Sequence, residues 1–118
     1  MIKEMVYSNL REKEILMEDV YKDVPFVIIS YGLWPCCYFQ ISTEEPKADI
    51  DIDDFHGLDV HGGVTLAGNL PGYKGTWIGW DYAHCGDFDV FTKDGNEWFI
   101  KDLINETLTG IDDYLKTF

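Results

Sequence analysis

Two short glycine-rich segments hold the side chains best suited to chemistry. The first, residues 61–65, reads His-Gly-Gly-Val-Thr, and the second, residues 79–87, reads Gly-Trp-Asp-Tyr-Ala-His-Cys-Gly-Asp. Each segment places a histidine close to glycine, which permits a positive φ or the close approach of another group. If the strands that carry the two segments pair with each other, we expect both histidines to face one pocket.

The ionisable side chains of these segments predict either acid–base chemistry or a site for a divalent metal ion. The candidate catalytic residues are His61, Asp81, His84 and Asp87, because an imidazole beside a carboxylate can move a proton near neutral pH. Three of them, His61, His84 and Asp87, carry nitrogen and oxygen donors that suit a divalent metal. A structural interpretation is equally simple, since a histidine hydrogen-bonded to an aspartate commonly pins a turn.

A further interpretation is the capture of a small ligand such as a nucleotide. Backbone N–H groups in glycine-rich turns can bind an anion. The candidate ligand-binding residues are Gly62, Gly63, Thr65, Trp80 and Gly86. The odd spacing of Trp77 and Trp80 places them on opposite faces of a strand, which leaves one of the two free to lie exposed beside the histidines.

The chain from about Tyr21 to its C-terminus resembles a functionally uncharacterised family of small proteins found mostly in phages, prophages and bacteria. The pattern of that family is an aromatic-rich hairpin, an acidic stretch, HGG-x-T, G-(F/W)-D-x-A-H-x-G-D and an amphipathic C-terminal helix, and residues 61–65 and 79–87 match both motifs. The hairpin departs from the pattern, because residues 33–38 stand where relatives tend to have a histidine or glycine near the cysteine. The resemblance implies a mobile-element setting but no activity. It points to His61, Thr65, Asp81, His84 and Asp87.

A run of strands followed by one helix is expected to position these segments. β-Branched and aromatic residues predict a hairpin of strands at 25–31 and 34–42, and further strands at 60–66, 76–82 and 88–92. From about Asn96 to Lys116 apolar residues recur three or four positions apart, which predicts an amphipathic helix with Asn96 as its N-cap. The helix residues expected to be buried are Ile100, Ile104, Leu108, Ile111 and Leu115. The fold class is α+β: a single domain, residues 1–118, in which a twisted antiparallel sheet of five or more strands carries the helix on one face.

Two segments have weaker patterns. Residues 1–14 are expected to form a short helix or a mobile or separately packed arm. Residues 44–59 carry five aspartates and no basic residue after Lys47, which predicts a solvated acidic loop. This loop begins like a calcium-binding loop at Asp49, but Asp54 replaces the glycine of the sixth position and Val60 replaces the glutamate of the twelfth.

Composition excludes several classes of protein. The chain has 118 residues, 46% of them hydrophobic, and a formal net charge of -13, which indicates one folded domain and not a disordered chain. Direct binding to nucleic acid is not expected, because that affinity comes from clustered Lys and Arg. No apolar run approaches the roughly 20 residues of a membrane span, and no apolar run follows Lys3 and Glu4 as in a signal peptide.

The three cysteines indicate a reducing compartment. Cys36 and Cys37 are adjacent, and the odd count leaves Cys85 over in any disulfide scheme. No Cys-x-x-Cys spacing supports a zinc ligand or a thiolate nucleophile, so we expect buried, small apolar residues. The expected location is the cytoplasm of a bacterium or of a phage-infected cell.

The leading functional prediction is a small acidic binding protein of the phage or mobile-element type. Its charge would steer it to a host protein or a defence-system component with a basic surface, which it would occupy as an inhibitor does. The alternatives are binding of a small, nucleotide-type ligand and metal-assisted hydrolysis at the His61, Asp81, His84 and Asp87 cluster. No cofactor is predicted other than the divalent metal ion of that last alternative.

Overall fold

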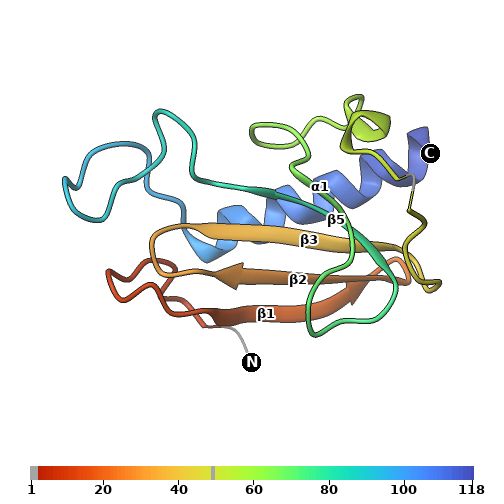
Figure 1. Cartoon of the computed structure of the whole chain (residues 1–118). Helices are drawn as coiled ribbons and strands as arrows, with labels where there is room; N and C mark the ends of the chain where they lie inside the picture. Colours follow the sequence, from red (N-terminus) through yellow and green to blue (C-terminus); the bar gives the residue numbers. More distant parts are fainter. Residues whose placement is uncertain (1–2, 49) are drawn as a thin grey trace.

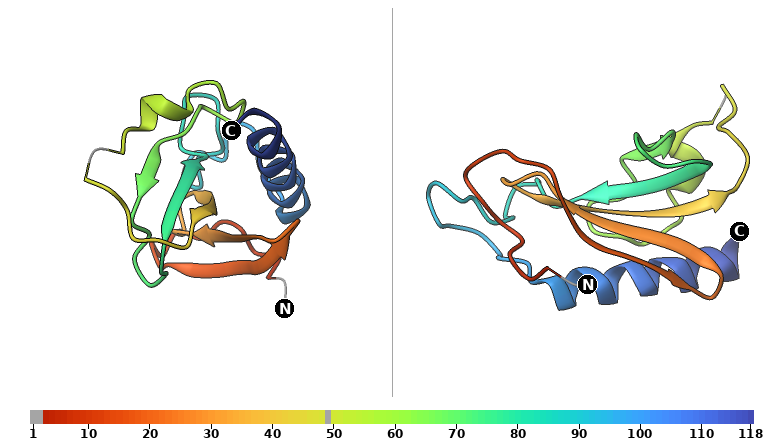
Figure 2. Two further views of the ribbon diagram at one scale, coloured as in Figure 1. Left: turned by 90° about the vertical axis from the view of Figure 1, so that its right-hand side faces the viewer. Right: turned by 90° about the horizontal axis from the view of Figure 1, so that it is seen from below.

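A computed structural model describes residues 3–48 and 50–118 and contains a five-stranded sheet with one long helix (Figure 1). In spatial order the strands are β1 (Glu14–Tyr21), β2 (Val24–Ser30), β3 (Pro35–Ser42), β5 (Thr76–Asp81) and β4 (Leu66–Gly68). Every neighbouring pair is antiparallel. The helix α1 (Ile100–Thr117) lies against one face of the twisted sheet (Figure 2). The α+β fold class is therefore confirmed.

Side chains alternate between two apolar layers along the central strands. On β5, Trp80 joins the large core between the sheet and α1, whereas Trp77 faces the smaller layer that contains Leu70. On β3, Cys37 belongs to the first layer and Tyr38 to the second. This alternation follows from the two-residue period of a strand. Both tryptophans are buried, at 3% and 1% exposure, so the expectation that one of them is exposed beside the histidines is wrong.

The strands predicted at 25–31, 34–42 and 76–82 are present with ends shifted by at most one residue. The strand predicted at 60–66 is wrong, because Gly62 and Gly63 have φ values of +70° and +81°, which no regular strand has. Only Leu66 of that range lies in β4. The strand predicted at 88–92 is also wrong. There the Asp89 carboxylate accepts hydrogen bonds from the N–H groups of Phe91 and Thr92 and holds the chain in a turn.

The helix begins three residues later than predicted, with its N-cap at Phe99. Asn96 is not its N-cap, because Asn96 bonds instead to residues 86 and 88 in an isolated bridge beside Asp87. The cap position is Phe99, whose N–H donates to the Asp102 carboxylate at 3.2 Å. Of the five helix residues expected to be buried, Ile100 and Ile111 are buried, Ile104 and Leu108 are partly buried, and Leu115 is 48% exposed. Burial of Leu115 was a wrong prediction, because in this part of the helix Tyr114 and not Leu115 packs against the core.

The N-terminal arm and the acidic loop have little regular structure. Residues 3–13 form no helix, and this arm packs on the sheet with Val6 5% exposed and the Lys3 N–H bonded to the Leu16 carbonyl at 3.0 Å. The acidic loop is largely exposed and contains one short 3-10 helix, η1 (Ile52–Phe55). Asp49, the first residue of the calcium-like stretch, lies outside the described residues.

The cysteines divide into two kinds. Cys36 and Cys37 are buried as predicted, and burial raises the pKa of each thiol to about 12, so neither is a thiolate near neutral pH. Cys85 was expected to be buried, and this prediction is wrong. Cys85 is exposed because it lies at the tip of the turn after β5. Among the described residues, no helix is both long enough and apolar enough to cross a membrane.

Candidate functional site

The two glycine-rich segments lie side by side, and the pairing of β4 with β5 explains why. These strands are antiparallel, so Leu66 at the start of β4 lies opposite Gly79 near the end of β5. The turn before β4 therefore meets the turn after β5. The imidazole centroids of His61 and His84 are 5.5 Å apart, with an angle of 58° between the ring planes. The predicted juxtaposition of the two histidines is confirmed.

Asp87 connects the residues of this cluster by hydrogen bonds. Its carboxylate accepts hydrogen bonds from His61 Nε2 at 2.9 Å, from the His84 N–H at 2.8 Å and from Trp98 Nε1 at 2.9 Å. The side chain is 5% exposed. Burial alone would raise the pKa of Asp87, but these three hydrogen bonds and the charge of His61 outweigh burial and lower the pKa below its usual value. Asp87 is thus a buried carboxylate held in its ionised form.

Aromatic rings hold the His61 imidazole on two sides. The ring stacks on Tyr82 with centroids 4.7 Å apart and planes inclined by 7°, and it meets the Trp98 ring in an edge arrangement with centroids 4.9 Å apart. The backbone N–H of His61 donates to Glu106 Oε1 on α1 at 2.8 Å. Because Asp87 accepts from Nε2, this ring has one orientation and a defined tautomer in its neutral form.

His84 is held by packing and not by a ring hydrogen bond. Its Nε2 lies 3.3 Å from Asp81 Oδ1, is buried, and has no hydrogen-bond partner among the described residues. Gly62 covers this nitrogen so closely that a Cβ at position 62 would lie 2.2 Å from Nε2. Asp81 itself accepts from the Thr65 hydroxyl at 3.1 Å and from the Ala83 N–H at 3.2 Å. A carboxylate was predicted to bind one of the two imidazoles. The structure shows this contact between Asp87 of the second segment and His61 of the first.

The cluster has the parts of a general base but not those of a complete hydrolytic site. An imidazole oriented by a buried carboxylate is the arrangement that activates a nucleophile. In the described part of the chain, however, no Ser, Thr or Cys side chain is hydrogen-bonded to either imidazole. No group of three or more His, Cys, Asp or Glu side chains among these residues is placed to hold a metal ion. Both Asp87 oxygens are already used as acceptors within the protein.

The five predicted ligand-binding residues do not form one site. Gly62 and Thr65 belong to the cluster through His84 and Asp81. Gly63 and Gly86 are turn residues with positive φ, and no atom lies within 4 Å of a Cβ added at either. Trp80 is inside the core and donates its indole N–H to Tyr82. Sequence reasoning missed the contacts of Trp98 and Glu106, for which no local pattern gave a signal.

A wide, shallow hollow adjoins His61. Its volume is about 660 Å³, and its wall includes His61, Trp98 and three carboxylates: Asp59, Asp102 and Glu106. The size suits a small molecule. The carboxylates, however, repel an anion such as a nucleotide and favour a cationic group.

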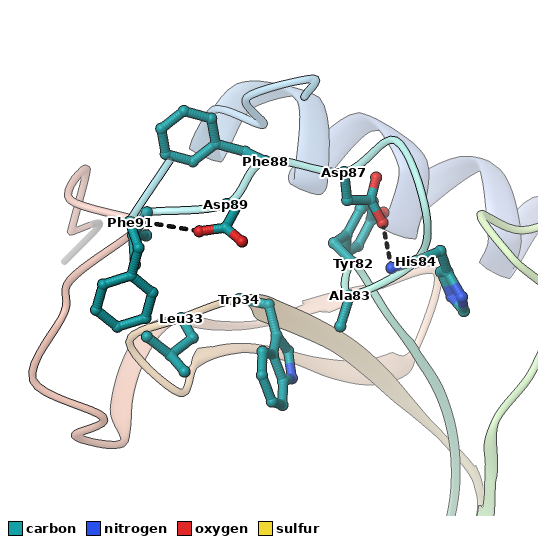
Figure 3. Close-up of a pocket in the computed structure, with 10 residues that line it drawn as sticks. Leu33, Trp34, Tyr82, Ala83, His84, Asp87, Phe88, Asp89 and Phe91 are labelled. Carbon is teal, nitrogen blue, oxygen red and sulfur yellow. Dashed lines mark hydrogen bonds between the residues drawn. The ribbon is translucent and has the colours of Figure 1, made fainter. Parts of the chain in front are cut away.

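A second, smaller cleft of about 220 Å³ adjoins His84 and Asp87 (Figure 3). The β2–β3 turn contributes Leu33 and Trp34, and the loop that follows Asp87 contributes Asp89 and Phe91. Figure 3 shows the His84 imidazole directed away from this cleft, while its backbone N–H donates to Asp87. The sequence carries one signal for this cleft. The turn at residues 32–35 reads Gly-Leu-Trp-Pro, and it has apolar residues at positions where turns usually have polar ones.

Comparisons with known proteins give no relative from which function can be transferred. No protein-family model, no curated protein and no solved structure matches the chain.

Proposed function

We propose that this protein binds a partner protein by docking an acidic face on the partner's basic surface. The acidic face is made of carboxylates from the loop around η1 and from the adjoining surface of α1. Its members are Asp51, Asp53, Asp54, Asp59, Asp102, Glu106 and Asp113.

The observation that carries this proposal is that the acidic loop contacts α1, which brings Asp59 beside carboxylates of the helix with no ion pair among the described residues to neutralise them. The loop and the helix are in contact, because the Asp59 N–H donates to Asp113 Oδ2 at 3.4 Å and the Phe55 ring lies 5.9 Å from that of Phe118. Among the described residues, none of the seven carboxylates forms an ion pair with Lys or Arg. The formal net charge of -13 strengthens the field around the face.

Such a face acts mainly on the rate of association. A strong single-sign field raises the on-rate for an oppositely charged partner by one to three orders of magnitude and loses this effect as salt increases. It also disfavours acidic partners, which gives selectivity. The mobile-element setting implied by the sequence resemblance makes a host protein or a defence-system component the expected partner, and occupation of its basic surface the expected mode of action.

The two alternatives have weaker support. Metal-assisted or acid–base hydrolysis requires a nucleophile or a metal, and the cluster at Asp87 uses its polar atoms to join segments of the chain. A nucleotide-type ligand would have to approach the carboxylates of Asp59, Asp102 and Glu106 to reach His61. Neither alternative accounts for the seven carboxylates of the acidic face, which form no ion pair with Lys or Arg among the described residues.

Two charge-matched variants test the proposal. The face variant carries Asp53→Asn, Asp54→Asn, Asp59→Asn and Asp113→Asn, and the control carries the same number of changes at exposed carboxylates elsewhere: Glu4→Gln, Glu12→Gln, Asp23→Asn and Asp94→Asn. A partner is first captured from a lysate of the source cells on the immobilised wild-type protein, identified and purified. Its association and dissociation rates are then measured at two salt concentrations.

The face variant should associate at least about tenfold more slowly than the wild type, with little change in dissociation. The control variant should stay close to the wild type. Equal slowing of both variants would show that total charge matters and not this face. Unchanged kinetics in both would leave the carboxylates as solubilising surface and refute the proposal.

A further inference from the structure

The cleft in Figure 3 adjoins the His61 cluster, because Tyr82, His84 and Asp87 form part of its wall. It lies between the β2–β3 turn and the loop of residues 88–95, beyond the N-terminal end of α1. Its wall combines apolar side chains, chiefly Leu33, Trp34 and Phe91, with the carboxylate of Asp89. None of the residues that line it is Lys or Arg. Lys93, the basic residue of the same loop, lines a neighbouring hollow with Tyr7 instead.

Two aromatic rings at this cleft are held out in solvent. Trp34 is 37% exposed and Phe91 is 64% exposed. The turn that carries Trp34 is closed by a hydrogen bond from the Tyr31 N–H to the Trp34 carbonyl at 2.9 Å. The loop that carries Phe91 is closed at its base by the bridge between Asp87 and Asn96. Exposed aromatic side chains on constrained turns are typical contact residues of protein–protein interfaces.

The Asp89 carboxylate is fixed in place beside these rings. Its Oδ1 accepts from the N–H groups of Phe91 at 2.8 Å and Thr92 at 3.2 Å. Figure 3 shows this carboxylate across the cleft from Leu33 and Trp34, with the hydrogen bond to Phe91 drawn. Because a carboxylate has two oxygens and about four lone pairs, Asp89 can accept further hydrogen bonds from a cationic group in the cleft.

We infer that this cleft receives an arginine side chain of the partner protein, with the guanidinium bound to Asp89 and stacked against Trp34 or Phe91. This inference rests on the proposed function and names a specific contact within it. The volume of about 220 Å³ lies below the roughly 300–1,000 Å³ of small-molecule sites and suits one long side chain.

Arginine fits this chemistry better than lysine. The guanidinium is planar, is weakly hydrated, stacks on aromatic faces and donates several hydrogen bonds to a carboxylate at once. A lysine ammonium is more strongly hydrated and would lose more on entering an apolar cleft. Arginine side chains are also frequent among residues that dominate the binding energy of interfaces.

A titration followed by nuclear magnetic resonance tests the cleft without the partner. The probes are N-acetyl-arginine amide and the neutral N-acetyl-citrulline amide, which has nearly the same shape. The arginine probe should give saturable shifts confined to the Trp34 indole N–H and the backbone N–H groups of Ala83 and Phe91. The citrulline probe should give much weaker binding, because it has no positive charge to pair with Asp89.

Asp89→Asn should raise the Kd of the arginine probe about tenfold or more, because a hydrogen bond to a charged group is lost. Asn keeps a side-chain oxygen for the N–H groups of Phe91 and Thr92, so the loop should stay folded, as unchanged shifts at residues 92–95 would verify. Asp94→Asn, an exposed change in the same loop, should leave the Kd unchanged. Absence of localised shifts, or equal binding of the citrulline probe, would overturn the inference.

The partner assay separates failure of this inference from failure of the proposed function. If the cleft receives an arginine, Asp89→Asn and Trp34→Leu should speed dissociation of the captured partner while association stays near that of the wild type. If both variants dissociate like the wild type while the acidic-face variant associates slowly, the cleft inference is wrong and the proposed function stands. If the acidic-face variant behaves like the wild type, the proposed function itself is wrong.

Discussion

Asp87 joins three parts of the chain that are distant in sequence. It binds the ring of His61 before β4, the backbone at His84 after β5, and the indole of Trp98 before α1. A buried carboxylate with three N–H donors stabilises a fold only while it remains ionised and fully bonded. At the scale of single residues, the cluster therefore holds three segments of the chain together.

Replacing Asp87 with asparagine should destabilise the protein by about 2–3 kcal/mol. The amide retains one acceptor oxygen, but its NH2 group would face an N–H donor, and the ionic character of the bond from His61 would be lost. Urea unfolding at pH 7 measures the effect. Asp94→Asn, an exposed change nearby, should alter the free energy of unfolding by less than about 0.5 kcal/mol.

The loss of stability caused by Asp87→Asn should become smaller as the pH falls. The pKa of Asp87 is lower in the folded protein than in the unfolded chain. Its stabilising contribution is therefore fully present above the unfolded pKa of about 4 and disappears as the pH falls through the folded pKa. The difference between wild type and variant, measured between pH 7 and pH 3, should narrow below about pH 4. A constant difference over this range would contradict the lowered pKa.

The close approach of Gly62 to His84 has its own test. Gly62→Ala and Gly63→Ala both place a side chain at a positive φ, but only the first creates a clash, with a Cβ 2.2 Å from His84 Nε2. Gly62→Ala should therefore destabilise more than Gly63→Ala by about 1–3 kcal/mol. Adding His84→Ala to Gly62→Ala should recover part of the loss. Equal effects of the two single alanines would show that only backbone strain matters.

At the scale of elements, α1 is held to the sheet by its N-terminal two-thirds. Leu103 and Ile111 are fully buried, and Thr107 between them is buried with its hydroxyl donating to the Leu103 carbonyl at 2.7 Å. Gly110 lets the helix approach the core closely, since a Cβ there would lie 3.2 Å from the Trp80 ring and 3.3 Å from Val60. This packing accounts for a glycine that costs about 1 kcal/mol in helix propensity.

Two leucine truncations should distinguish the buried and exposed parts of α1. Leu103→Ala removes a fully buried side chain and should cost about 2–5 kcal/mol, because a cavity remains in the core. Leu115→Ala, at 48% exposure, should cost less than about 1 kcal/mol. Thermal or urea unfolding measures both changes. A large effect at Leu115 would mean that the last helical turn packs as the periodicity predicted.

At the scale of the whole molecule, the formal charge of -13 opposes the compact state. The seven carboxylates of the acidic face contribute to this repulsion without a neighbouring Lys or Arg in an ion pair, as far as the described residues show. A surface of this kind lowers the folding stability of the isolated protein. It is therefore consistent with a face kept for association with a positively charged partner.

Salt should stabilise the protein, because it screens repulsion between carboxylates over distances longer than about 8 Å at physiological ionic strength. The midpoint of urea unfolding should rise between 20 mM and 500 mM NaCl. The rise should be smaller in the acidic-face variant Asp53→Asn, Asp54→Asn, Asp59→Asn, Asp113→Asn. A midpoint that falls with salt would show that attractive ion pairs outweigh the repulsion.

The sequence by itself determined the α+β class, the three central strands and the existence of the helix. These features depend on periodicity and β-branched content, which are local properties of the chain. It also predicted that His61 and His84 meet, although His61 lies in the turn before β4 and not on the strand that the prediction assumed. Wherever a carboxylate or a glycine overrode local propensity, as at Asp89 and Gly62, the predicted strand was absent.

Only the tertiary structure decided which groups face one another. Asp87 lies three residues from His84, yet its carboxylate binds the ring of His61, 26 positions away in the sequence. The acidic face requires the η1 loop to contact α1, and the cleft requires Trp34 to lie near Phe91. Neither juxtaposition is determined by residue spacing, because each depends on how two loops are held at the ends of a sheet whose strand order is not the order of the chain.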